Sequence, residues 1–169
     1  YTLCIPNKEI SIVFTANINL WFRGIINNID LHVFLEAFWN GDDKAVTESL
    51  SSVILKTLSC FDVYKEYFYH ALLTGIFYCQ AYKVTSNSES GYGFSDLLVT
   101  DTDNNRTAVI EIKQTKDIKK LNTLPDTALQ QIHDKQYSFS CEDEEPSVIH
   151  WGFGFCIKHF LAKSEIPCS

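Results

Sequence analysis

The chain has 169 residues, of which 46% are hydrophobic and 21% are charged, with 14 Lys and Arg against 21 Asp and Glu. The apolar fraction excludes a disordered chain, and the length predicts one domain, or one domain with a small extension. The formal charge of −7 disfavours a general nucleic-acid coat protein, because such proteins carry a basic surplus. No apolar run reaches the roughly 18 residues needed to span a bilayer, so we expect no membrane partner.

Cysteine usage favours a reducing compartment. The six cysteines form no C-x-x-C pair, and their spacing indicates neither a zinc site nor a disulfide framework. Cys79 and Cys156 lie in apolar stretches and are expected to be reduced core thiols, which suits a cytoplasmic protein. The chain begins without Met and contains none, so we expect a piece of a longer protein.

The first half of the chain is expected to be helical. The spacing of apolar residues predicts four helices, over 9–22, from 28 or 30 to 39, from 42 or 43 to 57, and over 62–82. The fourth is apolar on nearly every side, which predicts a buried helix. Within it, Glu66 and His70 lie four residues apart and so share one face.

The second half changes to strands. We expect strands over 83–88, 95–100, 107–114 and 148–157, a helix over 127–138, and a return of 160–162 onto the last strand. A loop is expected at 89–93. The predicted class is therefore a mixed α/β (α+β) fold, with an N-terminal helical extension over 1–60 and a second unit over 61–169, packed together.

The hairpin in this half carries the most informative charged residues. Side chains alternate along a strand, so Glu111 and Lys113 share one face of it. If the turn centres on residues 103–104, Asp96 lies directly across from Glu111. If it centres on residues 104–105, Asp96 faces Lys113 and is a diagonal neighbour of Glu111. Both registers bring the two carboxylates close together.

Two close carboxylates repel, and a hard divalent cation such as Mg²⁺ or Mn²⁺ relieves that repulsion. A cation held by Asp96 and Glu111 suits phosphodiester hydrolysis, because it binds a phosphate oxygen and lowers the pKa of a bound water. Lys113 is placed to orient that water or to stabilise developing charge. Glu66 is a further candidate ligand, direct or through water.

The ordered set of motifs resembles the PD-(D/E)XK nuclease superfamily. The closer resemblance is to the nuclease-like domain found C-terminal to an AAA-ATPase-like domain. The D…E-x-K element alone is weak, whereas the set in order is more specific. The matching segments are residues 5–9 (IPNKE), 57–62 (TLSCFD), 66–70 (EYFYH), 89–93 (ESGYG), Asp96, 109–113 (VIEIK), 128–132 (ALQQI) and 152–155 (GFGF).

The resemblance implies a restriction-endonuclease-like αβββαβ core and a metal-dependent nuclease that acts on nucleic acid, with DNA favoured. The implied catalytic residues are Asp96, Glu111, Lys113 and Glu66. The metal would be held by Asp96, Glu111, Ile112 and Glu66, and His70 is a further candidate at the site.

Other residues are candidates for contacts with nucleic acid. Gln131 matches the polar position that the family places on the helix after the sheet, and Lys135 lies one turn further along. Residues 105–135 carry a small basic surplus within an acidic chain, so Lys116 is a candidate for binding phosphates.

Two features leave other functions open. Phe94 stands where the family usually has Arg, and the chain has no phosphate-binding loop of an ATPase. The alternatives are a degenerate nuclease fold that binds nucleic acid or a partner, and a module that regulates an attached ATPase. A homodimer is a further candidate arrangement. Taken alone, without Asp96 and the family pattern, Glu111 and Lys113 are better explained by an ion pair on a solvated sheet face.

Overall fold

The computed structural model describes residues 31–57, 66–90, 93–135 and 147–167. The helix expected over 9–22 and the helix start expected at Asp62 lie outside these residues. The elements, in chain order, are α2 (Leu31–Asn40), α3 (Asp43–Thr57), α4 (Glu66–Cys79), β1 (Lys83–Ser90), β2 (Gly93–Asp101), β3 (Arg106–Gln114), the 3-10 helix η1 (Ile118–Thr123), α5 (Leu124–Asp134), β4 (Ser147–Cys156) and β5 (His159–Glu165).

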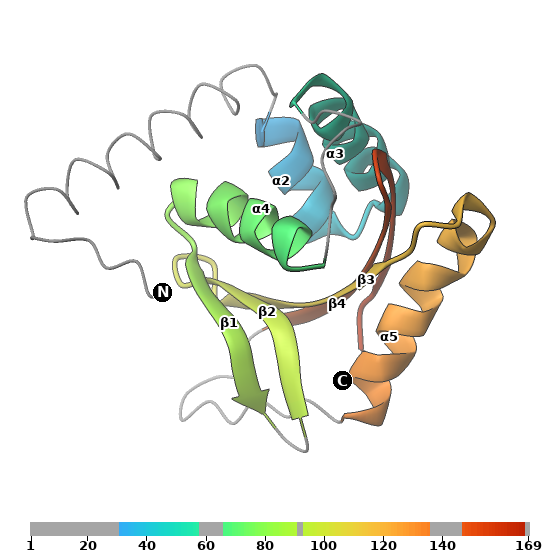
Figure 1. Cartoon of the computed structure of the whole chain (residues 1–169). Coiled ribbons are helices and arrows are strands. Elements are labelled where there is room, and N and C mark those ends of the chain that lie inside the picture. Colours follow the sequence, from blue (N-terminus) through green and yellow to red (C-terminus); the bar gives the residue numbers. More distant parts are fainter. Residues whose placement is uncertain (1–30, 58–65, 91–92, 136–146, 168–169) are drawn as a thin grey trace, which may run out of the picture.

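The five strands form one mixed sheet in the order β1-β2-β3-β4-β5 (Figure 1). β3 and β4 pair in parallel, and the other three neighbouring pairs are antiparallel. A parallel pair needs a crossover connection, which η1 and α5 supply here. The series α4-β1-β2-β3-α5-β4 is the expected αβββαβ core, and the expected return strand, β5, is also present. The predicted fold class is confirmed.

The helices cover both faces of this sheet (Figure 1). Helices α2, α3 and α4 share one hydrophobic cluster with alternate residues of the strands, among them Ile110, Ile112 and Trp151. The other face is covered by α5, where Val109 of β3 packs against Ile132. Consecutive residues of β3 therefore point into different layers, and both layers are closed to water.

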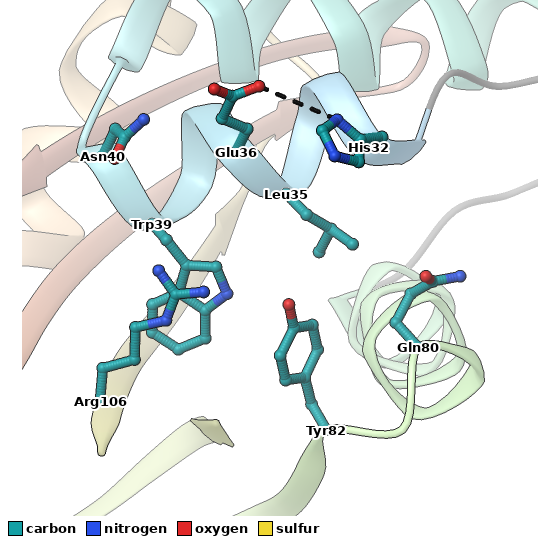
Figure 2. Close-up of a pocket in the computed structure, with 8 residues that line it drawn as sticks. All are labelled: His32, Leu35, Glu36, Trp39, Asn40, Gln80, Tyr82 and Arg106. Atoms are coloured by element: carbon teal, nitrogen blue, oxygen red, sulfur yellow. Dashed lines mark ion pairs between the residues drawn. The ribbon is translucent and has the colours of Figure 1, made fainter. Parts of the chain in front are cut away.

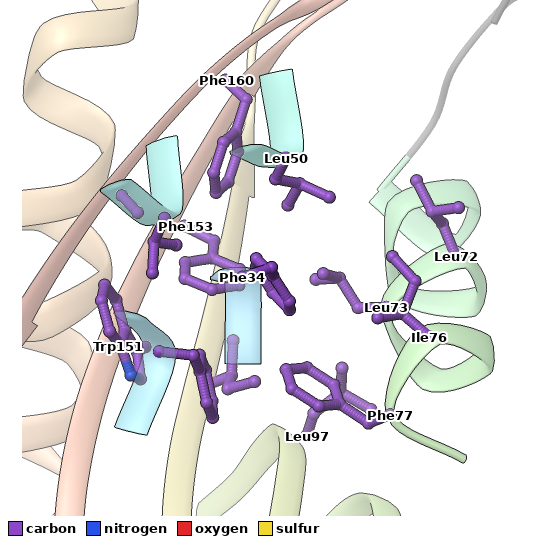
Figure 3. Close-up of a cluster of buried hydrophobic side chains, with 14 of the residues drawn as sticks. Phe34, Leu50, Leu72, Leu73, Ile76, Phe77, Leu97, Trp151, Phe153 and Phe160 are labelled. Atoms are coloured by element: carbon purple, nitrogen blue, oxygen red, sulfur yellow. The ribbon is translucent and has the colours of Figure 1, made fainter. Parts of the chain in front are cut away.

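The larger cluster is rich in aromatic rings (Figure 3). Phe38 of α2 stacks on Trp151 of β4 with ring centroids 5.3 Å apart, and Tyr69 of α4 stacks on Phe155 at 4.1 Å. Buried aromatic rings contribute more than their area alone, so these contacts tie α2 and α4 to the sheet. The division of the chain at residue 60 stays a prediction. No helix among the described residues is long and apolar enough to cross a membrane.

Helix α4 differs from its prediction. It ends at Cys79, and Ala81 then adopts a left-handed backbone with φ 62°, which no helix continues. It is also not buried all round, because Tyr67 and Tyr78 are 69% and 67% exposed. The expectation of a fully buried helix was wrong. Aromatic residues on a solvent-exposed side produced an apolar pattern that periodicity could not distinguish from burial.

Other boundaries also shift. α5 begins at Leu124, three residues before the prediction, because Pro125 fits the first helical turn. β1 continues to Ser90, which pairs with Gly93, so residues 89, 90 and 93 of the loop expected at 89–93 belong to strands. The 3-10 helix η1 was not predicted. By contrast, α3 begins as expected, since the backbone N–H of Ala45 donates to Asp42 Oδ1 at 3.0 Å.

Two glycines in β4 allow α5 to begin close to the sheet. A Cβ added at Gly152 would collide with the backbone carbonyl of Pro125, and one at Gly154 would lie 2.8 Å from Leu124 Cβ. We therefore expect Gly152→Ala to destabilise the fold by roughly 2–4 kcal/mol, because the obstacle is backbone and cannot rotate away. Urea unfolding followed by circular dichroism measures this free energy.

Ser147→Ala is the control for that measurement, since Ser147 is exposed at the start of the same strand. It should change the free energy of unfolding by less than about 0.5 kcal/mol. Equal stability of Gly152→Ala and the wild type would contradict the close approach of α5.

The turn between β2 and β3 is held by a buried carboxylate. Asp101, 5% exposed, accepts hydrogen bonds at Oδ2 from Asn104 Nδ2 at 2.9 Å and from Arg106 Nε at 2.8 Å. Burial raises the pKa of Asp101, but the hydrogen bonds from Asn104 and Arg106 outweigh it, so its net pKa is lowered.

A lowered pKa for Asp101 has a stability consequence. The ionised Asp101 carboxylate stabilises the fold at pH values above its ordinary pKa of 3.8. This stabilisation is lost as the pH falls through the lower folded-state pKa. We expect Asp101→Asn to reduce the free energy of unfolding at neutral pH by about 1–3 kcal/mol, with the difference shrinking in acid. Asp103→Asn, at an exposed position of the same turn, is the control. A difference that stays constant with pH would contradict this account.

Candidate active site

The hairpin places Asp96 and Glu111 near each other. β2 and β3 pair in the register Leu97↔Ile110 and Leu98↔Val109. This is the first of the two predicted registers, in which the next residues along, Asp96 and Glu111, lie opposite each other. The printed pairing of β2 with β3 ends at Leu97, whereas β3 stays paired with β4 at Glu111 and β2 stays paired with β1 at Ser95.

Glu111 is almost completely buried, with 1% of its surface exposed. It lies on the same face of β3 as Val109, which α5 covers. An ion pair on a solvated sheet face is therefore excluded as the explanation of Glu111 and Lys113. Burying a carboxylate carries a large desolvation cost, so its hydrogen-bond partners are informative.

The two oxygens of the Glu111 carboxylate have different surroundings. Oε1 accepts from Lys113 Nζ at 3.0 Å and from Gln131 Nε2, and Lys135 Nζ lies 3.8 Å away. Oε2 is buried and has no hydrogen-bond partner among the described residues. Native buried carboxylate oxygens are normally satisfied, so this oxygen is the expected position for a further ligand.

Asp96 is held by main-chain contacts. Its Oδ2 accepts from the backbone N–H of Ile112 at 2.7 Å, which replaces the missing rung of the ladder. His70 Nε2 of α4 lies 2.8 Å from the Asp96 carbonyl oxygen, and Ser86 Oγ is 3.2 Å from the same nitrogen. Because a carbonyl only accepts, His70 Nε2 carries the proton and donates. His70 thus fixes the backbone that carries Asp96.

The surroundings of Glu111 disfavour the ionised form of its carboxyl group. Burial raises the pKa of Glu111, and the neighbouring Asp96 carboxylate raises it further, while Lys113 and Lys135 oppose both effects. The net pKa lies above the ordinary value of 4.5. A positive charge beside Oε2 would reverse this balance.

The donor set fits a hard cation. Asp96 and Glu111 are oxygen ligands of the kind that Mg²⁺ and Mn²⁺ prefer, and the unpartnered Oε2 supplies the position. Within residues 31–57, 66–90, 93–135 and 147–167, no group of three His, Cys, Asp or Glu side chains is arranged to hold a metal ion. Two carboxylates completed by a backbone carbonyl and water match that finding.

Some of the predicted site residues do not lie with Asp96, Glu111 and Lys113, which form the candidate site cluster. Glu66 is exposed at the first residue of α4, and Lys116 is exposed in the turn between β3 and η1. In the part of the chain that the structure describes, neither is hydrogen-bonded or ion-paired with Asp96 or Glu111. The side chain of Phe94 lies outside the described set.

Gln131 and Lys135 do reach the cluster, but their partner is Glu111. The sequence predicts contacts with nucleic acid for both residues. Their contact with Glu111 depends on how α5 crosses β3, which no local pattern shows. Ser86 was missed altogether. It lies in a strand of mixed polar residues, with no signal that would single it out.

Comparison with known proteins agrees with this geometry. A family model described as PD-(D/E)XK nuclease superfamily matches residues 64–165. The chain belongs to the PD-(D/E)XK nuclease superfamily. The match spans the core from α4 to β5 and includes Asp96, Glu111 and Lys113. None of the curated proteins or solved structures matches this chain. Placement C-terminal to an AAA-ATPase-like domain stays a prediction.

Proposed function

We propose that this PD-(D/E)XK protein is a metal-dependent nuclease that hydrolyses the phosphodiester backbone of nucleic acid, with DNA favoured. Asp96 and Glu111, with the backbone carbonyl of Ile112, would hold Mg²⁺ or Mn²⁺. Lys113 would be the catalytic cation. Glu66 is exposed and makes no direct contact with Asp96 or Glu111 among the described residues. We therefore propose that it would bind the metal through water.

The observation that supports this most strongly is the unsatisfied Oε2 of Glu111. A carboxylate kept only for structure would have both oxygens paired, because leaving one unpaired and buried costs about 1–3 kcal/mol. Here Oε1 receives every donor and Oε2 receives none. One oxygen of the Glu111 carboxylate is thus left without a partner near the second carboxylate, Asp96. Such an arrangement is typical of a functional site.

The chain's own residues have separable tasks in this proposal. Gln131 and Lys113 hold the Glu111 carboxylate in one orientation through Oε1. Lys113 is 24% exposed, so its ammonium is accessible to donate to the attacking water or to a phosphate oxygen that gains charge. The Ile112 N–H and His70 fix Asp96, and α5 keeps bulk water from Glu111.

When bound, the metal would supply Lewis-acid activation of the phosphate and a lowered pKa for the attacking water. In an extended strand, the N–H and C=O of one residue point to the same side. The Ile112 N–H is directed at Asp96, so its carbonyl faces the same side of β3. This supports Ile112 as the backbone ligand.

Contacts with the nucleic acid are proposed for Lys135, Gln131 and Lys116. Lys135 is 29% exposed and lies at the edge of the cluster, so it would contact the phosphate next to the scissile one. Lys116 is exposed and would act through charge alone. Because the chain is acidic overall, we expect binding that depends on the metal and weakens steeply with salt.

The test is cleavage of a panel of single-stranded DNA, double-stranded DNA and RNA. We expect hydrolysis in Mg²⁺ or Mn²⁺ and none in EDTA, and we expect DNA to be cut faster than RNA. Equal cutting with and without EDTA would contradict a metal-dependent nuclease and indicate a contaminant.

The alternative is a degenerate module that binds nucleic acid or a partner, or that regulates an attached ATPase. Phe94 favours it, since the family usually places Arg there. It predicts salt-dependent binding to the same panel without any cleavage. Tight Mn²⁺ binding that is lost in Glu111→Ala would argue against it.

A further inference from the structure

A pocket of about 430 Å³ lies at the end of the sheet where β3 begins, and Figure 2 shows the residues that line it. Its lining comes from α2, from Gln80 and Tyr82 between α4 and β1, and from Arg106 at the beginning of β3. Arg106, which begins β3, and Glu111 are five residues apart on that strand, which is about 16 Å. The volume is within the usual range for small-molecule sites, roughly 300–1,000 Å³.

Arg106 is held in place at the wall of this pocket. Its Nε donates to Asp101 Oδ2 at 2.8 Å, and its guanidinium carbon lies 4.5 Å from the centroid of the Trp39 ring. Among the described residues, no partner is bound to its two terminal nitrogens. A guanidinium fixed in this way presents a paired donor that matches carboxylate or phosphate oxygens.

Two further donors lie beside it. The indole Nε1–H of Trp39 is buried and has no hydrogen-bond partner among the described residues. Figure 2 shows the Tyr82 hydroxyl projecting into the space between α2 and the turn that carries Gln80. A buried N–H without an acceptor is costly, and an oxygen of a ligand would satisfy it.

We propose that this pocket binds a small organic oxyanion, a carboxylate or a phosphate ester, through Arg106, Trp39 and Tyr82. The organic part of the ligand would contact Leu35, and the amide of Gln80 would hydrogen-bond to its polar groups. The site is separate from Asp96 and Glu111 and does not depend on the proposed nuclease activity.

Neighbouring carboxylates limit the affinity. The carboxylate of Asp101 offsets part of the charge of Arg106. A second carboxylate, Glu36, lines the pocket with its side chain 66% exposed, and its Oε2 lies 3.8 Å from His32 Nδ1. Recognition therefore rests on directed hydrogen bonds more than on net charge. We expect affinity in the micromolar to millimolar range rather than tighter.

The test is isothermal titration calorimetry of the full chain in EDTA, which removes any divalent ion. Ribose 5-phosphate and adenosine monophosphate represent phosphate esters, benzoate represents carboxylates, and adenosine is the uncharged control. We expect at least one charged probe to bind and adenosine not to bind. Binding of benzoate alone assigns a carboxylate ligand, and binding of the phosphates alone assigns a phosphate ester.

Variants locate the bound probe. Arg106→Gln should weaken binding about tenfold or more, and Tyr82→Phe, which removes only a hydroxyl, should weaken it about threefold to tenfold. Lys44→Gln, an exposed position on α3, should have no effect, and neither should Lys113→Ala. The proposal is overturned if no charged probe binds at millimolar concentration, if Tyr82→Phe binds as tightly as the wild type, or if Lys113→Ala abolishes binding.

Discussion

Replacing Lys113 with Ala is expected to lower the rate of the proposed metal-dependent DNA cleavage by roughly 10²–10³-fold, the usual effect of removing one preorganised transition-state donor. The free energy of unfolding should fall as well, because Lys113 offsets the burial of Glu111, although Oε1 keeps its contacts with Gln131 and Lys135. The measurement is the single-turnover cleavage rate with enzyme in excess, which separates chemistry from product release. Lys44→Ala, at an exposed position on α3, is the matched control for loss of a lysine.

Asp96→Asn provides a second test of the same prediction. An Asn side chain keeps an oxygen that accepts the Ile112 N–H, now 2.7 Å from Asp96 Oδ2, so the local backbone is preserved while the negative charge is lost. We expect cleavage to fall at least as far as in Lys113→Ala, with an unchanged circular dichroism spectrum. Wild-type rates in both variants would show that the chemistry lies elsewhere.

Glu111→Gln is expected to stabilise the protein at neutral pH while sharply lowering the rate of the proposed metal-dependent cleavage. Burial and Asp96 together outweigh Lys113 and Lys135 and raise the pKa of Glu111, so ionised Glu111 opposes folding. A neutral Gln of the same shape removes that opposition, by on the order of 1 kcal/mol. Urea unfolding in EDTA measures the change, and cleavage in Mg²⁺ should fall by about 100-fold or more.

The pH dependence gives the sign of this effect. The folded-state pKa of Glu111 lies above its ordinary value of 4.5. The stability that protonated Glu111 contributes is therefore fully present below pH 4.5 and is lost as the pH rises through the folded-state pKa. The stability advantage of Glu111→Gln should therefore be small in acid and grow toward neutral pH. Glu48→Gln, exposed on α3, should show no such trend. A Gln variant less stable than the wild type at pH 7 would mean that the lysines outweigh burial.

The hairpin that carries the candidate site could be predicted from the sequence for a simple reason. Alternation along β3 follows from strand geometry alone, so placing Glu111 and Lys113 on one face needed no knowledge of the rest of the fold. The turn residues between 101 and 106 limited the register to two alternatives. The structure has the one with Leu97 opposite Ile110.

What could not be predicted depends on packing between distant segments. Local sequence does not show that α5 covers Glu111, that Gln131 donates to it, or that His70 contacts the backbone of Asp96. The apolar pattern of α4 led to the opposite error, because Tyr67 is as hydrophobic in a periodicity count as a core residue yet is exposed. Burial is set by neighbours far apart in the chain.

A crystal of the wild-type protein soaked in Mn²⁺ tests the central claim most directly. We predict an anomalous difference peak between the carboxylates of Asp96 and Glu111, with Glu111 Oε2 within about 2.2 Å of the ion. A site that stays empty at saturating Mn²⁺, with Oε2 still unpartnered and Lys113 still bound to Oε1, would contradict the proposed metal centre.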